Sequence, residues 1–148
     1  MPIQQTTTTS FRVELFQAVH NFGPTAPNQF VIALYTGNAS LGPSTTVYTT
    51  SNEVSGTGYS AGGKNLDIDQ SPTAALDIDQ IPTAFVSFKN VSWPNASFTA
   101  RGALIYNSTS GDKSVAVLDF GADKTVVNQT FTVEFPSATA NSAIVRIS

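Results

Sequence analysis

The chain has 148 residues, of which 41% are hydrophobic and 11% charged; it has no cysteine and a formal net charge of −3. This length predicts one domain that buries about two thirds of its unfolded surface. Its seven Lys and Arg are scattered from Arg12 to Arg146, which argues against a nucleic-acid partner. The lack of cysteine excludes disulfides and thiolate-bound zinc. No apolar run approaches the roughly 18 residues that cross a bilayer, so no membrane partner is expected.

The first nine residues are predicted to form a flexible N-terminal arm. Segment 1–9 is rich in Gln and Thr and shows no hydrophobic periodicity, which is typical of chain that is extended or disordered when free. It also lacks the charged and apolar regions of a secretory signal, so we expect synthesis in a cytoplasm. Residues 10–148 are expected to form a single β-rich domain.

One amphipathic helix is predicted over residues 11–21. Apolar side chains recur there every four positions, at Phe11, Leu15 and Val19. Ser10 is the expected N-cap, and Gly23 stands where a helix ends. His20, the only histidine, then lies near the helix end. There we expect it to cap the helix or interact with its dipole, because no nucleophile accompanies it for catalysis.

Strands separated by turns are predicted for most of the remaining chain. Apolar or alternating runs indicate strands at 29–35, 46–50, 84–89, 97–106, 114–120, 129–135 and 142–147. Clusters of turn residues lie at 108–112 and 121–124. Short strands between such turns favour an antiparallel β-sandwich or barrel-like fold. The predicted fold class is therefore mainly β, with one short N-terminal α-helix.

A tandem repeat occupies residues 66–85. The segment Leu66–Ala75 is followed directly by Leu76–Phe85, and eight of the ten positions match. Two units are too few for a solenoid. We therefore interpret the duplication as a lengthened surface excursion or hairpin, since lengthening a loop costs little closure entropy.

The repeat carries the candidate metal ligands Asp67, Asp69, Asp77 and Asp79. Residues two apart share a face of a strand, and a ten-residue period preserves that face. Four carboxylates on one face would suit calcium, although the spacing does not match an EF-hand loop. The alternative is the solvated face of an amphipathic hairpin, whose charges discourage edge-to-edge pairing. Apart from this calcium alternative, no cofactor is expected.

Two interpretations are open for Trp93 and the tyrosines. Aromatic faces can stack on sugars, and Trp and Tyr also anchor protein interfaces. Alternatively, Trp93 is a core residue of a sandwich. Exposed aromatics would favour a carbohydrate- or receptor-binding protein, whereas buried ones would favour a structural role. The glycine-rich segment 56–63 lacks the spacing and the strand–helix context of a nucleotide-binding loop. No enzyme is expected.

Two segments are specific when taken together: Asn52–Tyr59 (NEVSGTGY) with Ala61–Gly63, and Phe98–Tyr106 (FTARGALIY). The first is expected to be a loop or edge strand, and the second a strand that bends at Gly102 and then buries Leu104 and Tyr106. Together with Ile32–Tyr35 and Val115–Gly121, they resemble small virion structural proteins of tailed bacteriophages. The tandem repeat is not part of this resemblance.

The resemblance implies a non-enzymatic virion component, most often a cement or decoration protein that binds and stabilises the capsid lattice. Its partner would then be the major capsid protein, and its place would be the capsid surface after synthesis in the host cytoplasm. A closed homo-oligomer, a trimer, would suit a local threefold axis. The alternative is a protein of the head–tail junction, tail or fibre with a carbohydrate- or receptor-binding β-sandwich.

Overall fold

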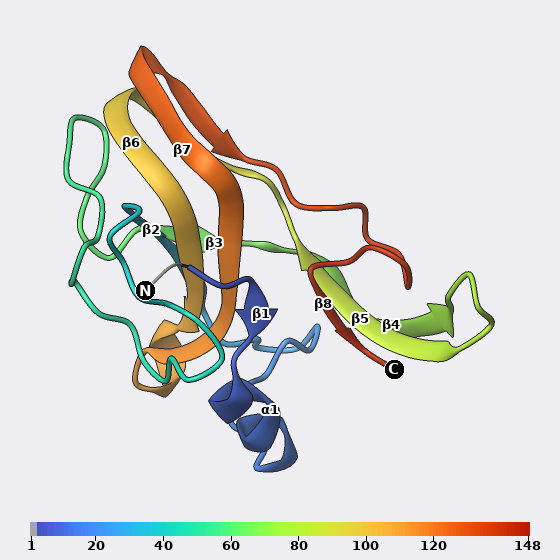
Figure 1. Cartoon of the computed structure of the whole chain (residues 1–148). Coiled ribbons are helices and arrows are strands. Elements are labelled where there is room, and N and C mark those ends of the chain that lie inside the picture. Colours follow the sequence, from blue (N-terminus) through green and yellow to red (C-terminus); the bar gives the residue numbers. More distant parts are fainter. Residues whose placement is uncertain (1–2) are drawn as a thin grey trace.

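Two antiparallel sheets dominate the computed structural model, which describes residues 3–148 (Figure 1). The larger sheet has the order β1-β7-β6-β2-β3, with β1 (Thr6–Thr7), β7 (Lys113–Val133), β6 (Val91–Asn107), β2 (Phe30–Tyr35) and β3 (Lys64–Leu66). The smaller sheet has the order β4-β5-β8, with β4 (Ile68–Leu76), β5 (Pro82–Phe88) and β8 (Val145–Ile147). The predicted mainly β class with one short N-terminal helix is confirmed, and two packed sheets are compatible with a sandwich.

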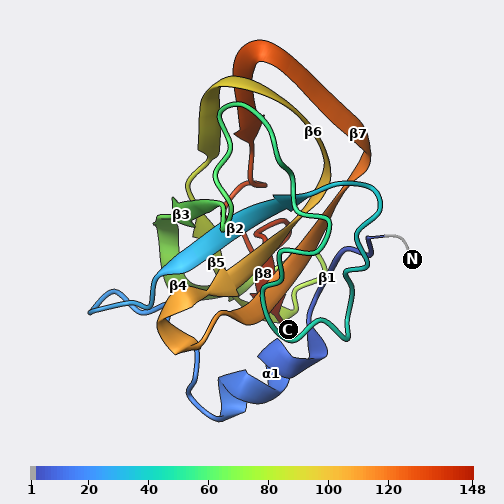
Figure 2. The same cartoon turned by 90° about the vertical axis from the view of Figure 1, so that its left-hand side faces the viewer.

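Strand β2 is buried on both faces, which explains why its sequence does not alternate. Phe30, Ile32 and Leu34 belong to the main core, which also contains residues of β5, β6, β7, β8 and the helix. The neighbouring side chains Val31 and Ala33 belong to a second cluster. That cluster lies under the long connection 36–63, which crosses one face of the larger sheet (Figure 2).

Strands β6 and β7 form one long hairpin, joined by the 3₁₀ turn η1 (Ser108–Ser110). The hairpin folds over sharply at its upper end in Figure 1. The predicted turn at 108–112 is confirmed, but the predicted break at 121–124 is wrong. β7 continues through Gly121, which has φ +82, because 124–126 still pairs with 98–100. The left-handed glycine bends the strand without ending it.

Helix α1 spans Thr9–Phe16, shorter and earlier than predicted. Its N-cap is Thr8, whose Oγ1 accepts a hydrogen bond from the Phe11 amide at 3.3 Å. Ser10, the predicted N-cap, lies inside the helix. The chain leaves helical geometry near Ala18, whose φ is 58°. Beyond it the chain is irregular, and Phe22 packs on the core while Val19 is half-buried.

The described part of the predicted arm is ordered against the sheet, contrary to expectation. Ile3 is only 5% exposed and forms a parallel bridge with Leu41. The two residues of β1 pair with Val117 and Ala116 of β7. Threonine favours strands, and here it covers the edge of β7. Met1 and Pro2 of the arm lie outside the described residues.

The tandem repeat forms a hairpin, as one of its interpretations predicted. Its first copy supplies β4, and its second copy supplies the turn and the start of β5. The hairpin projects to the right in Figure 1. Segment 46–50, predicted as a strand, contributes only an isolated bridge between Val47 and Lys113, because its backbone hydrogen bonds to β7 and the residue before it are limited to those of Thr46 with Ser114 and of Tyr48 with Asp112.

Candidate functional site

Glu53 is the centre of a hydrogen-bond network in the glycine-rich loop. Its Oε2 accepts from the Tyr48 hydroxyl and its Oε1 from the Tyr59 hydroxyl, both at 2.6 Å. The Gly62 amide donates to Oε1 at 2.8 Å. Burial, and then the hydrogen bond to Glu53, raise the pKa of both tyrosines. Hydrogen bonds to a charged acceptor are the stronger kind, so this carboxylate fixes the fold of the loop.

The same network joins the glycine-rich loop to Tyr106 of β6 and to Leu34 of β2. The Tyr106 hydroxyl donates to the Gly62 carbonyl at 2.6 Å, and the Leu34 amide donates to the Tyr59 hydroxyl at 2.9 Å. Burial, followed by Asp112 and Glu53, raises the pKa of Tyr106 to about 12. Each of these polar groups bonds to another group of the protein. The network therefore gives these residues a structural role, which is to hold the loop on the sheet.

Gly63 explains why this loop must end in glycine. Its φ is +84°, and a Cβ there would lie 1.8 Å from the Ile32 carbonyl oxygen. At Gly102, where the strand was predicted to bend, a Cβ would lie 2.5 Å from the Leu118 carbonyl oxygen. β6 shifts its register between Ala100 and Gly102, so the predicted bend is confirmed, as is the burial of Leu104 and Tyr106.

A second polar cluster surrounds His20, which lies beyond the helix and neither caps it nor occupies its last turn. His20 Nε2 is 2.9 Å from Glu14 Oε1, and Nδ1 is 3.0 Å from Asn107 Nδ2. Asn107 also donates to Asn28 Oδ1, and its own Oδ1 accepts from the Thr109 amide. Nδ1 is therefore the acceptor, and Nε2 carries the proton that points to Glu14.

The cluster contains a carboxylate, an imidazole and an amide, the same kinds of group as a catalytic relay, but it lacks the exposure that a relay needs. The His20 side chain is 0% exposed, and both ring nitrogens are already bonded. A general base needs a free nitrogen within reach of a substrate, so the cluster is suited to joining the helix to β6. The sequence does not reveal this cluster, because Asn107 lies 87 residues from His20.

The four aspartates of the repeat do not form one site. Asp67 and Asp69 lie at the base of the β4–β5 hairpin, whereas Asp77 and Asp79 lie at its turn. Asp77 Oδ1 accepts from the amides of Asp79 and Ile81. Among the described residues, no three His, Cys, Asp or Glu side chains gather as a metal site. The expected shared face fails because the second copy turns back instead of continuing the strand.

Trp93 is a core residue. Only 2% of it is exposed, and it packs near Tyr59 and Phe131, with centroids 6.1 Å from each. The core interpretation is thus confirmed, and Trp93 is not available as a sugar-stacking platform. Tyr35 and Tyr106 are buried as well.

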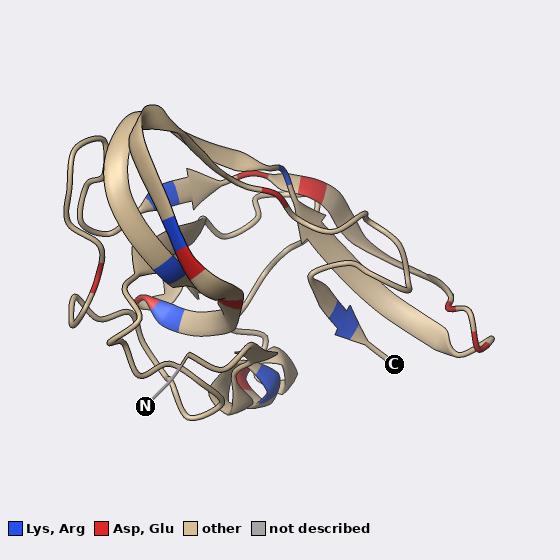
Figure 3. Ribbon diagram, turned by 45° about the horizontal axis from the view of Figure 1, so that its top comes forward, with Lys and Arg blue, Asp and Glu red and all other residues tan. Residues whose placement is uncertain are grey.

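Charged side chains are dispersed over the described part of the chain, as Figure 3 shows. Lys and Arg do not gather on one face of the ribbon, which matches their scatter in the sequence. Within residues 3–148, no helix has the length and apolar character needed to cross a membrane.

Large apolar side chains are instead exposed at three extremities of the molecule. Phe16 at the end of α1 is 95% exposed, Ile78 at the β4–β5 turn 81%, and Val127 in the distal part of β7 65%. Leu76 and Ile81 beside Ile78 are 56% and 45% exposed. Phe16 and Val127 are exposed singly, whereas Leu76, Ile78 and Ile81 form a cluster of the kind that marks an interaction surface.

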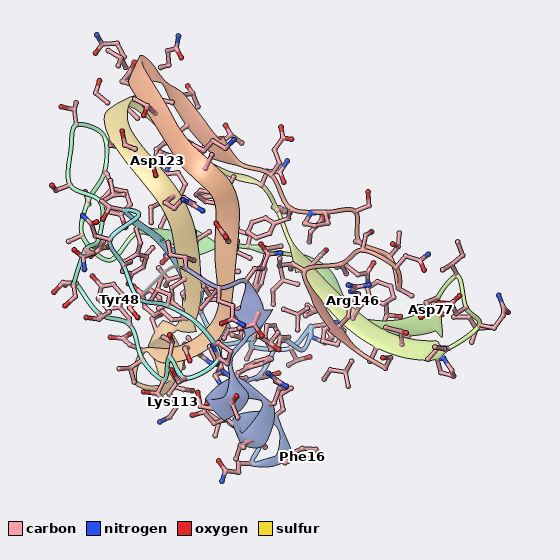
Figure 4. The ribbon with its side chains drawn as sticks, viewed as in Figure 1. Phe16, Tyr48, Asp77, Lys113, Asp123 and Arg146 are labelled. Carbon is pink, nitrogen blue, oxygen red and sulfur yellow. The ribbon has the colours of Figure 1, made fainter. Side chains whose placement is uncertain are left out.

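A groove lies between α1 and β8, with a volume of about 480 Å³. Its apolar lining includes Phe11, Leu15, Phe16, Val145 and Ile147, and Arg12 and Arg146 also line it. A second hollow of about 370 Å³ shares four of these apolar residues and extends the groove towards β5. We call these together the helix groove. Figure 4 shows Phe16 at the lower end of α1 and Arg146 on β8.

Comparisons of the chain with protein-family models, with curated proteins and with solved structures give no match.

Proposed function

We propose that this protein is a non-enzymatic virion structural protein of a tailed bacteriophage, a cement or decoration protein that binds the capsid lattice. The observation that carries the proposal is the exposure of apolar side chains at separate projecting ends, Phe16, Ile78 and Val127. A protein that touches several neighbours needs contact points at its extremities. A protein that binds one small ligand needs instead one concave site with convergent polar groups.

The distal part of the β6–β7 hairpin exposes mostly uncharged side chains, with the charges of Asp123 and Lys124 at its bent end, and this composition supports contact with the coat lattice. Its exposed face carries hydroxyl pairs across the strands, Ser92 with Thr132 and Thr99 with Thr125, each at 2.8 Å. Val127 is exposed on the same part of the hairpin. Burying hydroxyl and apolar groups costs far less than burying charge, so this face suits the major capsid protein as partner.

The proposal assigns the protein to the capsid surface, after synthesis in the host cytoplasm. A closed homo-oligomer, with three copies around a local threefold axis, follows from the symmetry of the lattice. The alternative of a sugar-binding tail or fibre protein loses its main support, because Trp93 is buried.

The decisive experiment is quantitative mass spectrometry of purified virions. A copy number equal to that of the major capsid protein, or a fixed simple fraction of it, supports the proposal. A handful of copies would move the protein to the junction or tail, and its absence from the particle would overturn a virion role. Val127→Asp is expected to lower capsid occupancy, whereas Val47→Asp, at an exposed valine (47%) outside this hairpin, is the matched control.

A further inference from the structure

The tip of the β4–β5 hairpin, residues 76–81, is an apolar knob whose exposed side chains do not contribute to the core of their own chain. Leu76, Ile78 and Ile81 are all exposed there. Asp77 Oδ1 holds the turn closed through the Asp79 and Ile81 amides, at 2.8 and 2.9 Å. The Ile78 amide also donates to Asn141 Oδ1 at 2.6 Å. The knob is therefore held in shape before any partner arrives, which lowers the entropic cost of docking.

The knob and the helix groove are neighbouring but distinct surfaces: Asp77 shares a small hollow with Arg146, whereas Ile78 lines neither hollow of the groove. Figure 4 places Asp77 at the outer end of the hairpin and Phe16 at the end of α1, with Arg146 in the region between them. The hydrogen bond to Asn141 ties the knob to its own C-terminal segment. Leu76, Ile78 and Ile81 line neither hollow of the helix groove of their own chain, so the groove is open to an occupant from outside.

The two surfaces match in chemistry. The knob has exposed aliphatic side chains beside Asp77 and Asp79, and no Lys or Arg occurs between residues 65 and 88. Among the described residues that line the main hollow of the helix groove, the charged side chains are Arg12 and Arg146 and none is acidic. Its volume of about 480 Å³ far exceeds the ~150 Å³ that holds a benzene-sized apolar group.

We infer that the hairpin knob of one copy docks in the helix groove of a second copy of this chain, with Ile78 against the apolar lining and the aspartates towards the arginines. Because knob and groove are different surfaces, the contact is heterologous, and each copy both gives and receives one. Successive contacts close into a ring when the rotation between copies allows it. This inference concerns the isolated protein and does not rest on the virion role.

The test is analytical ultracentrifugation of the purified full chain and of four single variants. Ile78→Asp removes the knob and Phe16→Asp damages the groove; both side chains are exposed, so folding is expected to be kept. Val47→Asp and Val13→Asp are the controls, since both positions are exposed and lie outside the knob and the groove lining. Loss of one buried aliphatic or aromatic contact is expected to weaken association at least about tenfold.

Mixing the two broken variants makes the test specific. The natural chain and both controls are expected to associate, while Ile78→Asp and Phe16→Asp are each expected to sediment as monomers. Their equimolar mixture is expected to form a one-to-one complex, because the intact knob of Phe16→Asp meets the intact groove of Ile78→Asp. A natural chain that stays monomeric throughout its soluble range, or a mixture that stays monomeric, would overturn the inference. Failure of this test leaves the virion copy number unchanged, so the two proposals are separable.

Discussion

The Glu53 carboxylate accepts the Tyr59 hydroxyl at 2.6 Å, across only six residues of chain. The contact closes the glycine-rich loop on itself, and the Leu34 amide then bonds to the same hydroxyl. A loop of small residues therefore gains a fixed shape from one charged group. This loop covers the second core cluster, so the burial of that cluster depends on the Glu53 carboxylate.

Replacing Glu53 by Ala is expected to lower the free energy of unfolding by about 2–4 kcal/mol, because three donors lose their charged acceptor. Glu53→Gln keeps the shape and is expected to cost less. Urea unfolding measures both. Glu134→Ala is the control, because Glu134 is exposed. Equal effects at the two positions would contradict the role given to Glu53.

Substitutions at Gly111 and Gly63, which both have positive φ, distinguish the cost of backbone strain from the cost of steric overlap. Gly111→Ala has open space around the new methyl group and is expected to cost about 1 kcal/mol from strain alone. Gly63→Ala would place its Cβ 1.8 Å from the Ile32 carbonyl oxygen. We expect it to disrupt the β2–β3 junction and to lower the melting temperature far more. Similar melting temperatures for the two variants would count against this close approach.

The tyrosines make stability sensitive to alkaline pH. The pKa of Tyr106 is raised to about 12 in the folded protein, against about 10 in an unfolded chain. Its stabilising contribution is therefore complete below about pH 10 and is lost as the pH rises towards 12. Tyr48 and Tyr59 shift in the same direction.

Tyr106→Phe isolates this effect. At neutral pH the variant is expected to be about 1 kcal/mol less stable, because it loses the hydrogen bond to Gly62. That difference is expected to shrink between about pH 10 and pH 12. In this range Tyr106 ionises in the unfolded natural chain but stays protonated in the folded one, so ionisation favours unfolding. Denaturant unfolding at a series of pH values provides the measurement, and a difference that is constant with pH would contradict the assignment.

Asn107 is expected to be among the most sensitive polar positions in the protein. It is fully buried and bonds to His20, Asn28 and the Thr109 amide. Asn107→Ala is expected to destabilise by about 2–4 kcal/mol, because it leaves buried polar groups without partners. Asn65→Ala, at an exposed position, is expected to change the denaturation midpoint very little. A mild effect at Asn107 would show that the cluster is not structural.

Trp93 provides a spectroscopic check on the core. Its emission is expected to be blue-shifted, weakly quenched by acrylamide and unaffected by host polysaccharide, because the side chain is 2% exposed. Solvent-like emission that responds to polysaccharide would restore the carbohydrate-binding alternative.

The sequence predicts the strands of this fold better than their connections. β2 and the turn at 108–112 follow from local pattern, because a buried apolar run and a cluster of turn residues each determine their own structure. The continuous β7 was missed because a strand that bends at Gly121 has the same local signature as two strands and a turn. The helix was predicted too long because Val19 and Phe22 lie in irregular chain after it, where Phe22 packs on the core.

The surfaces were harder to predict than the elements. Periodicity shows that Phe11 and Leu15 share a side, but it does not show that Phe16 is left exposed. The repeat indicates a hairpin, yet the separation of Asp67 from Asp77 depends on where the second copy turns. Contacts such as His20 with Asn107 depend on long-range pairing, which leaves no local spacing to recognise.

The strand order also carries a consequence for the order of folding. β6 and β7 are joined by a short turn, whereas β1 pairs with a partner about 110 residues away in the chain. Closing a short loop costs less entropy than closing a long one, so the β6–β7 hairpin is expected to nucleate and β1 to join late. In native-state hydrogen exchange, the amides of residues 3–8 would then open at the lowest free energy, well before those of β6.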